Sequence, residues 1–428
     1  MLNKVKDFSD RHHIAIVWVL RIILGAVFVV SGLSKSIDVS GFVFKMQEYL
    51  DVWSLDVPLP LITVAAIILS GAEFVIGMML MLGAYRRASV WLLLLMMAVM
   101  LPLTAYIWAA NPVSDCGCFG DFVKLPNGAT FWKNVVITIG LILLLPRNPK
   151  VKGVYHAYTQ WLAAVASSLY VLAVALYGLN IQPLVDFRSF PAGSRIVADT
   201  DDQDDSEYEF IYAKNGNEQT FTLDNLPDST WSFVSRRQIG GEKERSDATE
   251  LNIYDENGDN VTQEAIATEG EQLLIVIPQA EKANISGTYA INELQRYLAD
   301  KDASVIELIA TDSDSLDAWR DKSMASLPIY LAEETTLKEL SRGDISAVFV
   351  RDGVILWKRT LPTIDVDLVT SGAISLDDYE TDGRMTLALM TLVFLSMLVI
   401  VYMIDASRKF IAWREKKRLD KRKKSNLI

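Results

Sequence analysis

Apolar residues in this chain gather into long continuous runs rather than into short alternating patterns. A helix rises about 1.5 Å per residue, so about 20 apolar residues cross the roughly 30 Å hydrocarbon layer of a membrane. A polar segment of about 200 residues separates the fifth run from the sixth and is long enough to bury its own core. The pattern predicts six transmembrane helices, at residues 14–34, 61–83, 88–110, 131–146, 160–180 and 386–404.

The first apolar run has the basic flank of a removable signal peptide, because Lys4, Lys6 and Arg11 precede it. Its length of about 20 residues exceeds that of a signal-peptide core, and no small-residue cleavage site follows it. Arg21 also interrupts the run. We therefore expect a first span that is retained.

Clustered Lys and Arg residues mark the cytoplasmic loops of membrane proteins. Here they fall in the N-terminal arm, the Tyr85-Arg86-Arg87 turn, the Arg147–Lys152 loop and the C-terminal tail. The pattern predicts an inner-membrane protein of a bacterium with both termini cytoplasmic and residues 182–384 periplasmic. The basic residues of the tail are Arg408, Lys409, Arg414, Lys416, Lys417, Arg418, Lys421, Arg422, Lys423 and Lys424.

The net charge of −12 conceals a division between the polar segment and the rest of the chain. Residues 182–384 contain 41 acidic and 18 basic residues, whereas the remainder contains 12 acidic and 23 basic ones. An acidic domain of this kind favours solubility over a specific ligand. The basic tail suits either a topology signal or binding of anionic lipid or an acidic partner, and nothing beside it indicates nucleic-acid binding.

Both cysteines of the chain lie in Asp115-Cys116-Gly117-Cys118-Phe119-Gly120-Asp121, between the third and fourth predicted spans on the outer side. An oxidising periplasm allows thiol pairs to form disulfides. A bridge across one intervening residue closes a small, strained ring that is easily reduced, and Gly117 and Gly120 allow the turns it needs. A structural staple would normally close a longer loop. The pattern favours an electron-exchanging pair.

Two other interpretations of the cysteines remain open, namely a locally structural disulfide and a soft metal site such as Cu(I). Asp115 and Asp121 are expected either to raise the thiol pKa values or to order the loop through turn hydrogen bonds. A zinc site is not expected, because a closed site needs four ligands and no histidine is near. The histidines are predicted on the opposite side and are His12, His13 and His156.

Charged residues within spans are costly and should find partners. Arg21 in the first span and Glu73 in the second are predicted at similar depth, so we expect an Arg21–Glu73 ion pair. Its role is either helix packing or a site linked to protons or to a quinone head group. Lys35 is expected to reach the interface. The glycines expected to allow close helix approach are Gly25, Gly32, Gly71 and Gly77.

The polar segment begins with an acidic linker at 199–209 and strands at 208–213 and 220–223, which Asn215-Gly216 joins by a turn. A continuous apolar strand follows at 272–277. Helices near 285–299, 315–324 and 334–341 alternate with strands at 304–310 and 328–331. A hairpin around Asp352-Gly353 ends the segment. The order predicts an α/β domain.

Two sets of residues resemble known membrane families. The opening motif of the DoxX-like membrane proteins is similar to Arg21, Gly25, Phe28, Ser31-Gly32 and Lys35. The cysteine loop, followed by Phe131, Lys133 and Asn134, resembles the methylamine utilisation protein MauE branch of that superfamily, over residues 14–147. The resemblance implies a four-helix bundle tied to cysteine chemistry outside the membrane. It marks Cys116 and Cys118, with Arg21 and Glu73 as polar positions.

The strand and helix order of the polar segment looks like a thioredoxin-like domain of the peroxiredoxin-related kind. Where the redox motif of that fold would follow the first strand, the chain has Glu281-Lys282-Ala283-Asn284. Ile345-Ser346-Ala347 occupies the usual position of the cis-proline. The resemblance implies a domain that cannot itself perform dithiol chemistry but can bind a partner protein.

The expected plan is a helical transmembrane bundle with an α/β thioredoxin-like domain outside. Its parts are a DoxX/MauE-like four-helix unit at 1–150, a fifth helix at 160–180, an outer domain at 182–384, a sixth helix at 386–404 and a basic tail at 405–428. One hypothesis is a thiol–disulfide relay or maturation factor for envelope proteins, using a periplasmic partner and a quinone near Arg21 and Glu73. The other is a non-enzymatic scaffold or complex subunit with a structural cysteine loop.

Overall fold

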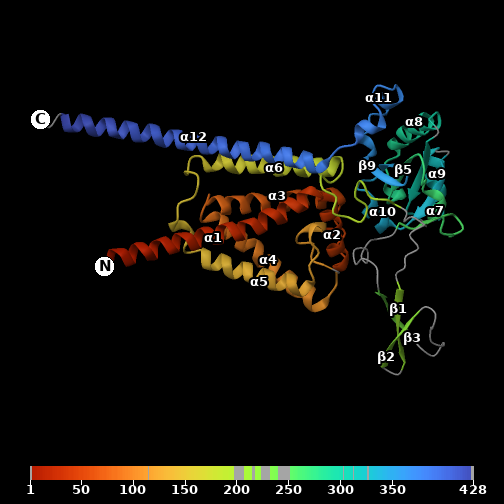
Figure 1. Ribbon diagram of the computed structural model, residues 1–428, viewed down its shortest axis with the longest axis horizontal. Coiled ribbons are helices and arrows are strands. Elements are labelled where there is room, and N and C mark those ends of the chain that lie inside the picture. Colours follow the sequence, from red (N-terminus) through yellow and green to blue (C-terminus); the bar gives the residue numbers. More distant parts are fainter. Residues whose placement is uncertain are drawn as a thin grey trace. The chain divides into compact units, whose positions relative to one another are not determined.

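The computed structural model describes residues 2–113, 115–196, 207–214, 217–222, 232–239, 251–301, 303–311, 313–324 and 327–425 (Figure 1). The chain forms two compact units. Unit 1 comprises Met1–Arg188 and Arg359–Ile428, and unit 2 comprises Ser189–Lys358. Unit 2 contains fewer residues than the outer domain expected at 182–384. The boundaries of that outer domain stay a prediction.

Unit 1 is helical. Its principal helices are α1 (Leu2–Ile37), α2 (Val39–Val52), α3 (Leu59–Leu82), α4 (Ala88–Ala110), α5 (Asn127–Leu144), α6 (Gln160–Asn180) and α12 (Gly383–Ser425). Among the described residues, all but α2 carry a segment long and apolar enough to cross a membrane, which makes six candidate spans. The prediction of a multi-pass membrane protein is confirmed. The short helix α2 was not expected, and it forms the connection between the first two spans.

Large apolar side chains cover the outward faces of these helices. Leu61, Val64 and Ile68 on α3 are 53–62% exposed, whereas Ile62 and Ala66 on the same helix are buried. Apolar side chains on both faces are expected of a helix whose outer surface meets hydrocarbon rather than water. The outward faces of the spans therefore contact the lipid bilayer.

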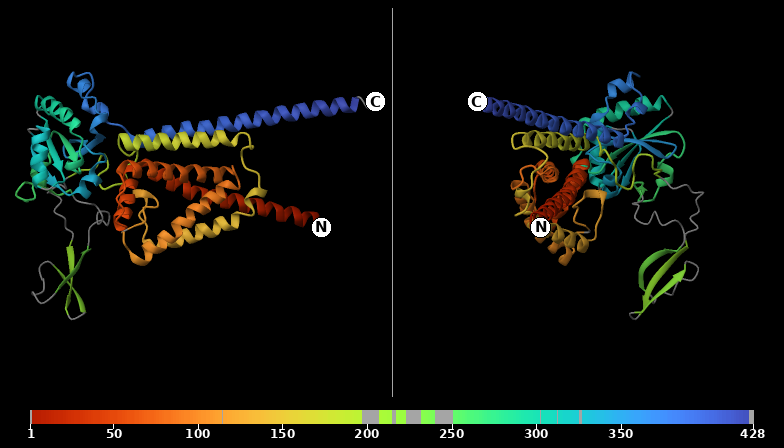
Figure 2. Two further views of the ribbon diagram at one scale, coloured as in Figure 1. Left: turned by 180° about the vertical axis from the view of Figure 1, so that it is seen from behind. Right: turned by 60° about the vertical axis from the view of Figure 1, so that its left-hand side comes forward.

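Helix α12 packs along α6 in Figure 1 and in both views of Figure 2. Tyr170 of α6 and Phe394 of α12 stack with ring centroids 4.6 Å apart, and Phe74 of α3 contacts both rings. At another level Asp405, which is fully buried, accepts a hydrogen bond from the Thr159 hydroxyl at 2.8 Å. Aromatic contacts and this buried carboxylate together fix the last span to the bundle.

The chain leaves and re-enters unit 1 at adjacent points. The backbone N–H of Thr360 donates to the carbonyl of Ile181 at 3.1 Å, and its hydroxyl donates to the carbonyl of Asn180. A Cβ on Gly383 would lie 2.1 Å from the Leu184 carbonyl, so only glycine allows this approach. Between these contacts run η6 (Leu361–Thr363), α11 (Val366–Thr370) and η7 (Leu376–Tyr379).

Unit 2 contains a six-stranded sheet in the order β4-β7-β6-β5-β8-β9. The strands β5, β6 and β7 are parallel, β8 is antiparallel to β5, and β4 is antiparallel to β7. Their bounds are β4 (Ile253–Tyr254), β5 (Glu271–Ile277), β6 (Ser304–Ile309), β7 (Ile329–Ala332), β8 (Ser346–Arg351) and β9 (Val354–Thr360). The connecting helices are α7 (Thr262–Ala265), α8 (Thr288–Ala299), α9 (Ser313–Ser323) and α10 (Glu334–Leu340). The α/β prediction is confirmed.

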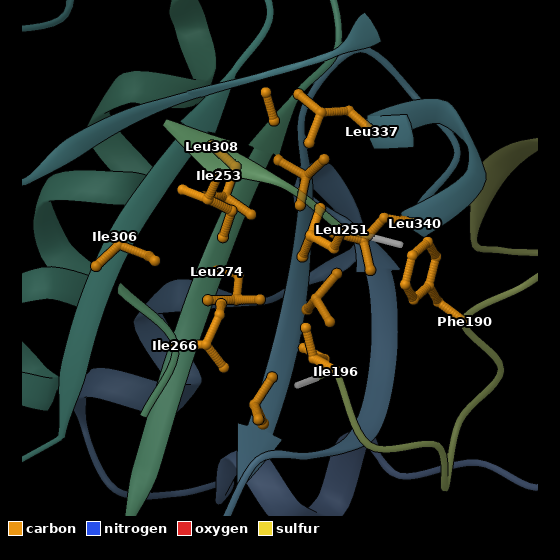
Figure 3. Packing of buried hydrophobic residues seen from close by; sticks show 14 of the residues in the cluster. Phe190, Ile196, Leu251, Ile253, Ile266, Leu274, Ile306, Leu308, Leu337 and Leu340 are labelled. Carbon is orange, nitrogen blue, oxygen red and sulfur yellow. The ribbon is translucent and has the colours of Figure 1, made fainter. Parts of the chain in front are cut away.

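Both faces of the central strand β5 are buried, as its uninterrupted apolar sequence predicts. One face contributes Leu274 to a cluster with Ile253, Ile306 and Leu308 (Figure 3). The turn between β8 and β9 has positive φ angles at Asp352 and Gly353, which is the backbone that the Asp-Gly pair favours. These features follow directly from the sequence pattern.

A charged residue lies in this apolar sheet. Glu307 of β6 is fully buried, and its Oε2 accepts a hydrogen bond from Trp319 Nε1 at 3.0 Å. Among the described residues, no hydrogen-bond partner contacts the other oxygen, Oε1. Burial raises the pKa of Glu307, and the Trp319 hydrogen bond only partly opposes that rise.

A separate sheet in the order β2-β1-β3 comprises β1 (Glu207–Lys214), β2 (Asn217–Thr222) and β3 (Ser232–Ile239). The strands expected at 208–213 and 220–223 therefore exist. The Asn215-Gly216 turn and residues 199–206 of the expected acidic linker lie outside the described residues.

Candidate functional site

Glycines bring α1 and α3 unusually close. A Cβ on Gly32 would lie 2.4 Å from the backbone nitrogen of Phe74, and one on Gly25 would lie 2.9 Å from the carbonyl of Gly77. The expectation that Gly25, Gly32 and Gly77 allow close helix approach is confirmed. Gly71 does not take part, since its Cβ would meet only a Val171 methyl at 3.8 Å.

This crossing places two charged side chains together. Lys35 Nζ of α1 lies 2.7 Å from Glu73 Oε1 and 2.8 Å from Oε2 of α3. Lys35 is 1% exposed and Glu73 is 5% exposed. The expectation that Lys35 reaches the interface is wrong, because the buried carboxylate gives its ammonium group a better partner than the head-group region.

Arg21 does not reach Glu73, so the predicted ion pair is wrong. Its guanidinium donates to Asn148 Oδ1 at 2.6 Å and to the carbonyls of Asn148, Val151 and Lys152. Its position beside Gly83 explains the error, since residue 83 lies ten positions, or roughly 15 Å, along α3 from Glu73. The combined quinone site expected near Arg21 and Glu73 is therefore not formed.

The cysteine loop folds so that its two sulfurs face each other. Cys116 Sγ and Cys118 Sγ are 2.6 Å apart, and both cysteines are free thiols in this structure. Gly117 and Gly120 have φ angles of 65° and 55°, in the left-handed region that favours glycine. Cys116 is buried beside Ile107 and Val113, whereas Cys118 is partly exposed. The two residues therefore differ in solvent exposure.

Hydroxyl groups from two helices hold the carbonyls of this loop. Ser31 Oγ of α1 lies 2.6 Å from the Cys118 carbonyl oxygen and 2.7 Å from Glu73 Oε2. Tyr49 of α2 donates to the Cys116 carbonyl at 2.8 Å. The buried Lys35–Glu73 pair and the cysteine loop are thus parts of one hydrogen-bonded network.

Asp115 stabilises the same loop from its N-terminal end. It accepts a hydrogen bond from the Gly117 backbone N–H at 2.8 Å and one from Lys45 Nζ at 2.9 Å. Burial would raise the pKa of Asp115, but the Lys45 interaction, the Gly117 N–H and the Lys124 charge together outweigh it and lower that pKa. The Gly117 N–H contact is a turn hydrogen bond of the kind expected for Asp115, and the role expected for Asp121 stays a prediction.

The environment separates the two thiols electrostatically. The hydrogen bond from Cys116 lowers the pKa of Cys118 to about 7 in spite of burial, and the nearby Lys133 and Lys35 contribute. The hydrogen bond to Cys118, together with burial, raises the pKa of Cys116. The expectation that flanking acids raise both thiol pKa values is wrong for Cys118, because cations and the neighbouring thiol dominate there.

The remaining predicted residues take structural positions. Asn134 of α5 is buried and lies 3.3 Å from Thr104 Oγ1 of α4, where it can link two spans. Asp121 and Gly120 belong to η1 (Gly120–Phe122), which continues the cysteine loop.

Among the described residues, no group of three or more His, Cys, Asp and Glu side chains could hold a metal ion. The site therefore consists of thiols, hydroxyls and paired charges.

The sequence analysis assigned no role to four residues of the site. Ser31 and Lys133 lay inside motifs, but nothing indicated their contacts. Lys45 and Tyr49 are four residues apart and therefore share one face of α2, which meets the loop. Lys133 of α5 lies over the Phe119 ring at 4.3 Å. A helix predicted at residues 39–52 would have placed Lys45 and Tyr49 on the same face.

Comparison with known families agrees with this geometry. Residues 14–147 match the family model of methylamine utilisation protein MauE, and residues 206–240 match a domain of unknown function (DUF8463). No curated protein matches the chain. The MauE match spans α5 and the cysteine loop as well as the crossing of α1 and α3. The chain is therefore a multi-pass membrane protein whose residues 14–147 are similar to the methylamine utilisation protein MauE family.

Proposed function

We propose that the chain is a membrane thiol–disulfide relay or maturation factor for cysteine-containing envelope proteins. The observation that carries this function is the facing pair of free sulfurs, 2.6 Å apart, in which residue Cys118 is partly exposed and residue Cys116 is buried. Such a pair can form and release an internal disulfide. Partial exposure makes Cys118 the thiol that a partner protein can reach.

In the oxidative half of the exchange, the Cys118 thiolate attacks a disulfide of the partner and one partner sulfur leaves. The Cys116 sulfur then attacks Cys118 Sγ in the mixed disulfide, and the second partner sulfur leaves. One S–S bond forms in this chain as one breaks in the partner. The partner gains two electrons, and the two protons of the dithiol end on its two sulfurs.

We propose that unit 2 is a thioredoxin-like domain that binds the partner without exchanging electrons. Its three parallel strands, connecting helices and final β8–β9 hairpin support the resemblance. Both cysteines of the chain lie at 116 and 118, so unit 2 has no thiol of its own. Partner recognition by a domain carried on the same chain would raise the local concentration of substrate at Cys118.

The orientation expected from the basic residues places the cysteine loop in the periplasm. Arg86 and Arg147 lie in the loops at the opposite ends of their spans from Cys116 and Cys118, as the proposal requires. In Figure 1 the first residues of α1 and the last turn of α12 extend from the same end of unit 1. A cytoplasmic location for both termini follows from this proposal.

The relay is tested by trapping in intact cells. Cys116→Ser leaves the attacking thiol but removes the resolving one, so a mixed disulfide with a partner should accumulate. Cys118→Ser is the matched control and should trap far less, because Cys116 is buried. Equal trapping by both variants, or trapping by neither, contradicts the relay.

One observation favours the alternative of a scaffold with a structural loop. Cys116 packs with Ile107 and Val113 as an ordinary apolar core residue. On that alternative, a Cys116→Ala/Cys118→Ala double variant would support growth like the wild type under both reducing and oxidising stress. Loss of complementation at normal protein abundance excludes it.

A further inference from the structure

The Ser31 hydroxyl joins a buried charge pair to the loop that carries the thiols. Its oxygen lies 2.6 Å from the Cys118 carbonyl and 2.7 Å from Glu73 Oε2. A hydroxyl has one hydrogen, whereas a peptide carbonyl and a carboxylate only accept. The two acceptors therefore compete for the same hydrogen, and the balance depends on how strongly Lys35 holds Glu73.

Lys35 contacts both oxygens of Glu73, at 2.7 and 2.8 Å. This double contact satisfies both oxygens of the carboxylate and leaves the Ser31 hydrogen available to the Cys118 carbonyl. The pair and Ser31 are all 8% exposed or less, so water does not compete with them effectively. The ion pair thus sets how firmly the loop is held.

The two anchored carbonyls are placed where ring closure would disturb them. In a Cys116–Cys118 bridge, the Cys116 carbonyl carbon is part of the closed ring and the Cys118 carbonyl is attached at its end. Any backbone twist that accommodates the bridge moves the oxygens that Tyr49 and Ser31 hold in the dithiol form. Both anchors therefore stabilise the dithiol relative to the disulfide.

We propose that Ser31 is a positioning residue of the thiol pair, through which the buried Lys35–Glu73 pair shifts the equilibrium toward the dithiol. This inference rests on the proposed function. It assigns the buried Lys35–Glu73 pair a role beyond helix packing. Lys35, Glu73 and Ser31 exchange no electrons, and the bonds made and broken are those of the thiol–disulfide exchange described above.

The test measures the dithiol–disulfide equilibrium of the full chain in detergent, across glutathione redox buffers, with maleimide labelling of free thiols. Because the chain has two cysteines, all labelling reports on this site. Ser31→Ala should shift the equilibrium toward the disulfide by about fivefold, the effect of one hydrogen bond. The matched control is Ser36→Ala, because Ser36 is fully buried in the same helix and its hydroxyl donates to the Gly32 carbonyl at 2.7 Å.

A second variant covers the case in which Ser31→Ala fails to fold. Tyr49→Phe keeps the ring and its packing with Trp53 but removes the other anchor. It should also shift the equilibrium toward the disulfide. Equilibria of Ser31→Ala and Tyr49→Phe within twofold of Ser36→Ala, or shifted toward the dithiol, overturn the inference.

The wild-type protein separates this inference from the proposed function. If its thiols form no internal disulfide in any buffer, the relay itself fails. If they cycle and the anchor variants behave like the control, the relay stands and only the positioning role is lost. A Lys35→Met variant, which leaves the Glu73 carboxylate to compete for the Ser31 hydrogen, should shift the equilibrium in the same direction as Ser31→Ala, and no shift there contradicts the part assigned to the ion pair.

Discussion

Lys35 Nζ lies 2.7 Å from Glu73 Oε1 in the interior of a helical membrane bundle, where neither side chain is more than 7% exposed. Two opposite charges at this depth offset each other's desolvation, whereas one alone would be uncompensated. Close packing of α1 on α3 at Gly32 allows the contact. The ion pair, the helix crossing and the cysteine loop consequently depend on one another.

Single and double removal of this pair should therefore differ. Lys35→Met leaves a buried carboxylate without its cation and should destabilise the protein by about 3–5 kcal/mol. Lys35→Met/Glu73→Leu removes both charges and should recover most of that loss. Thermal unfolding of the purified protein, in a double-mutant cycle that includes Glu73→Leu, measures the coupling. Additive effects of the two single variants contradict the pairing.

The helix crossing makes a separate prediction. Gly32→Ala places a methyl group where the backbone of Phe74 lies, and overpacking of this kind costs about 1–3 kcal/mol or more. Gly71→Ala on α3 is the matched control, because its methyl meets only ordinary contact at 3.8 Å. The midpoint of thermal unfolding should fall for Gly32→Ala and stay near wild type for Gly71→Ala. Equal midpoints would contradict the close approach.

The thiols should react at different pH. With its pKa lowered to about 7, Cys118 should reach half its maximal alkylation rate near neutral pH, while Cys116 stays slow. Cys116→Ala removes the donor that stabilises the thiolate, so the rate at pH 7 should fall about tenfold as the pKa returns toward its ordinary value of about 8.5. Mass spectrometry of iodoacetamide-treated protein locates the label. A Cys116→Ser variant, which keeps a donor, should lose less.

The buried Glu307 should make the stability of unit 2 depend on pH. Its folded pKa is raised by burial above the unfolded value, so the protonated form is favoured by folding. The stabilisation that Glu307 contributes is fully present below its unfolded pKa. It is lost as the pH rises through its folded pKa. Glu307→Gln should therefore stabilise the domain at pH 8, by about 1–3 kcal/mol, and change it little at pH 4.

Hydrogen exchange of the β6 amides in the full chain measures this effect. Glu271→Gln is the control, because Glu271 is 37% exposed in its pair with Arg351 and an exposed pair contributes little. A Glu307→Gln variant with the same pH dependence as the wild type would show that this carboxyl does not titrate with folding.

The sequence predicted the membrane spans and the α/β domain well because each rests on a local pattern. The uninterrupted apolar run at 272–277 is typical of a strand buried on both faces, and β5 is such a strand. The cysteine loop was equally local, since both thiols lie in one seven-residue segment. Patterns of this kind do not depend on which helix lies beside which.

The partners of the intramembrane charges depended on tertiary structure and were therefore missed. Counting from the expected start of the first span placed Arg21 level with Glu73, whereas Arg21 lies beside Gly83 and Lys35 takes its place. The roles of Ser31 and Tyr49 rest on contacts with residues 87 and 67 positions away. No local pattern encodes such distances in sequence.

The adjacency of Ile181 and Thr360 makes the intervening polypeptide an insertion whose two ends already touch. An inserted module whose two ends coincide can be acquired, exchanged or lost during evolution without opening the helical bundle. Only the short distance between Ile181 and Thr360 would have to be bridged in its place.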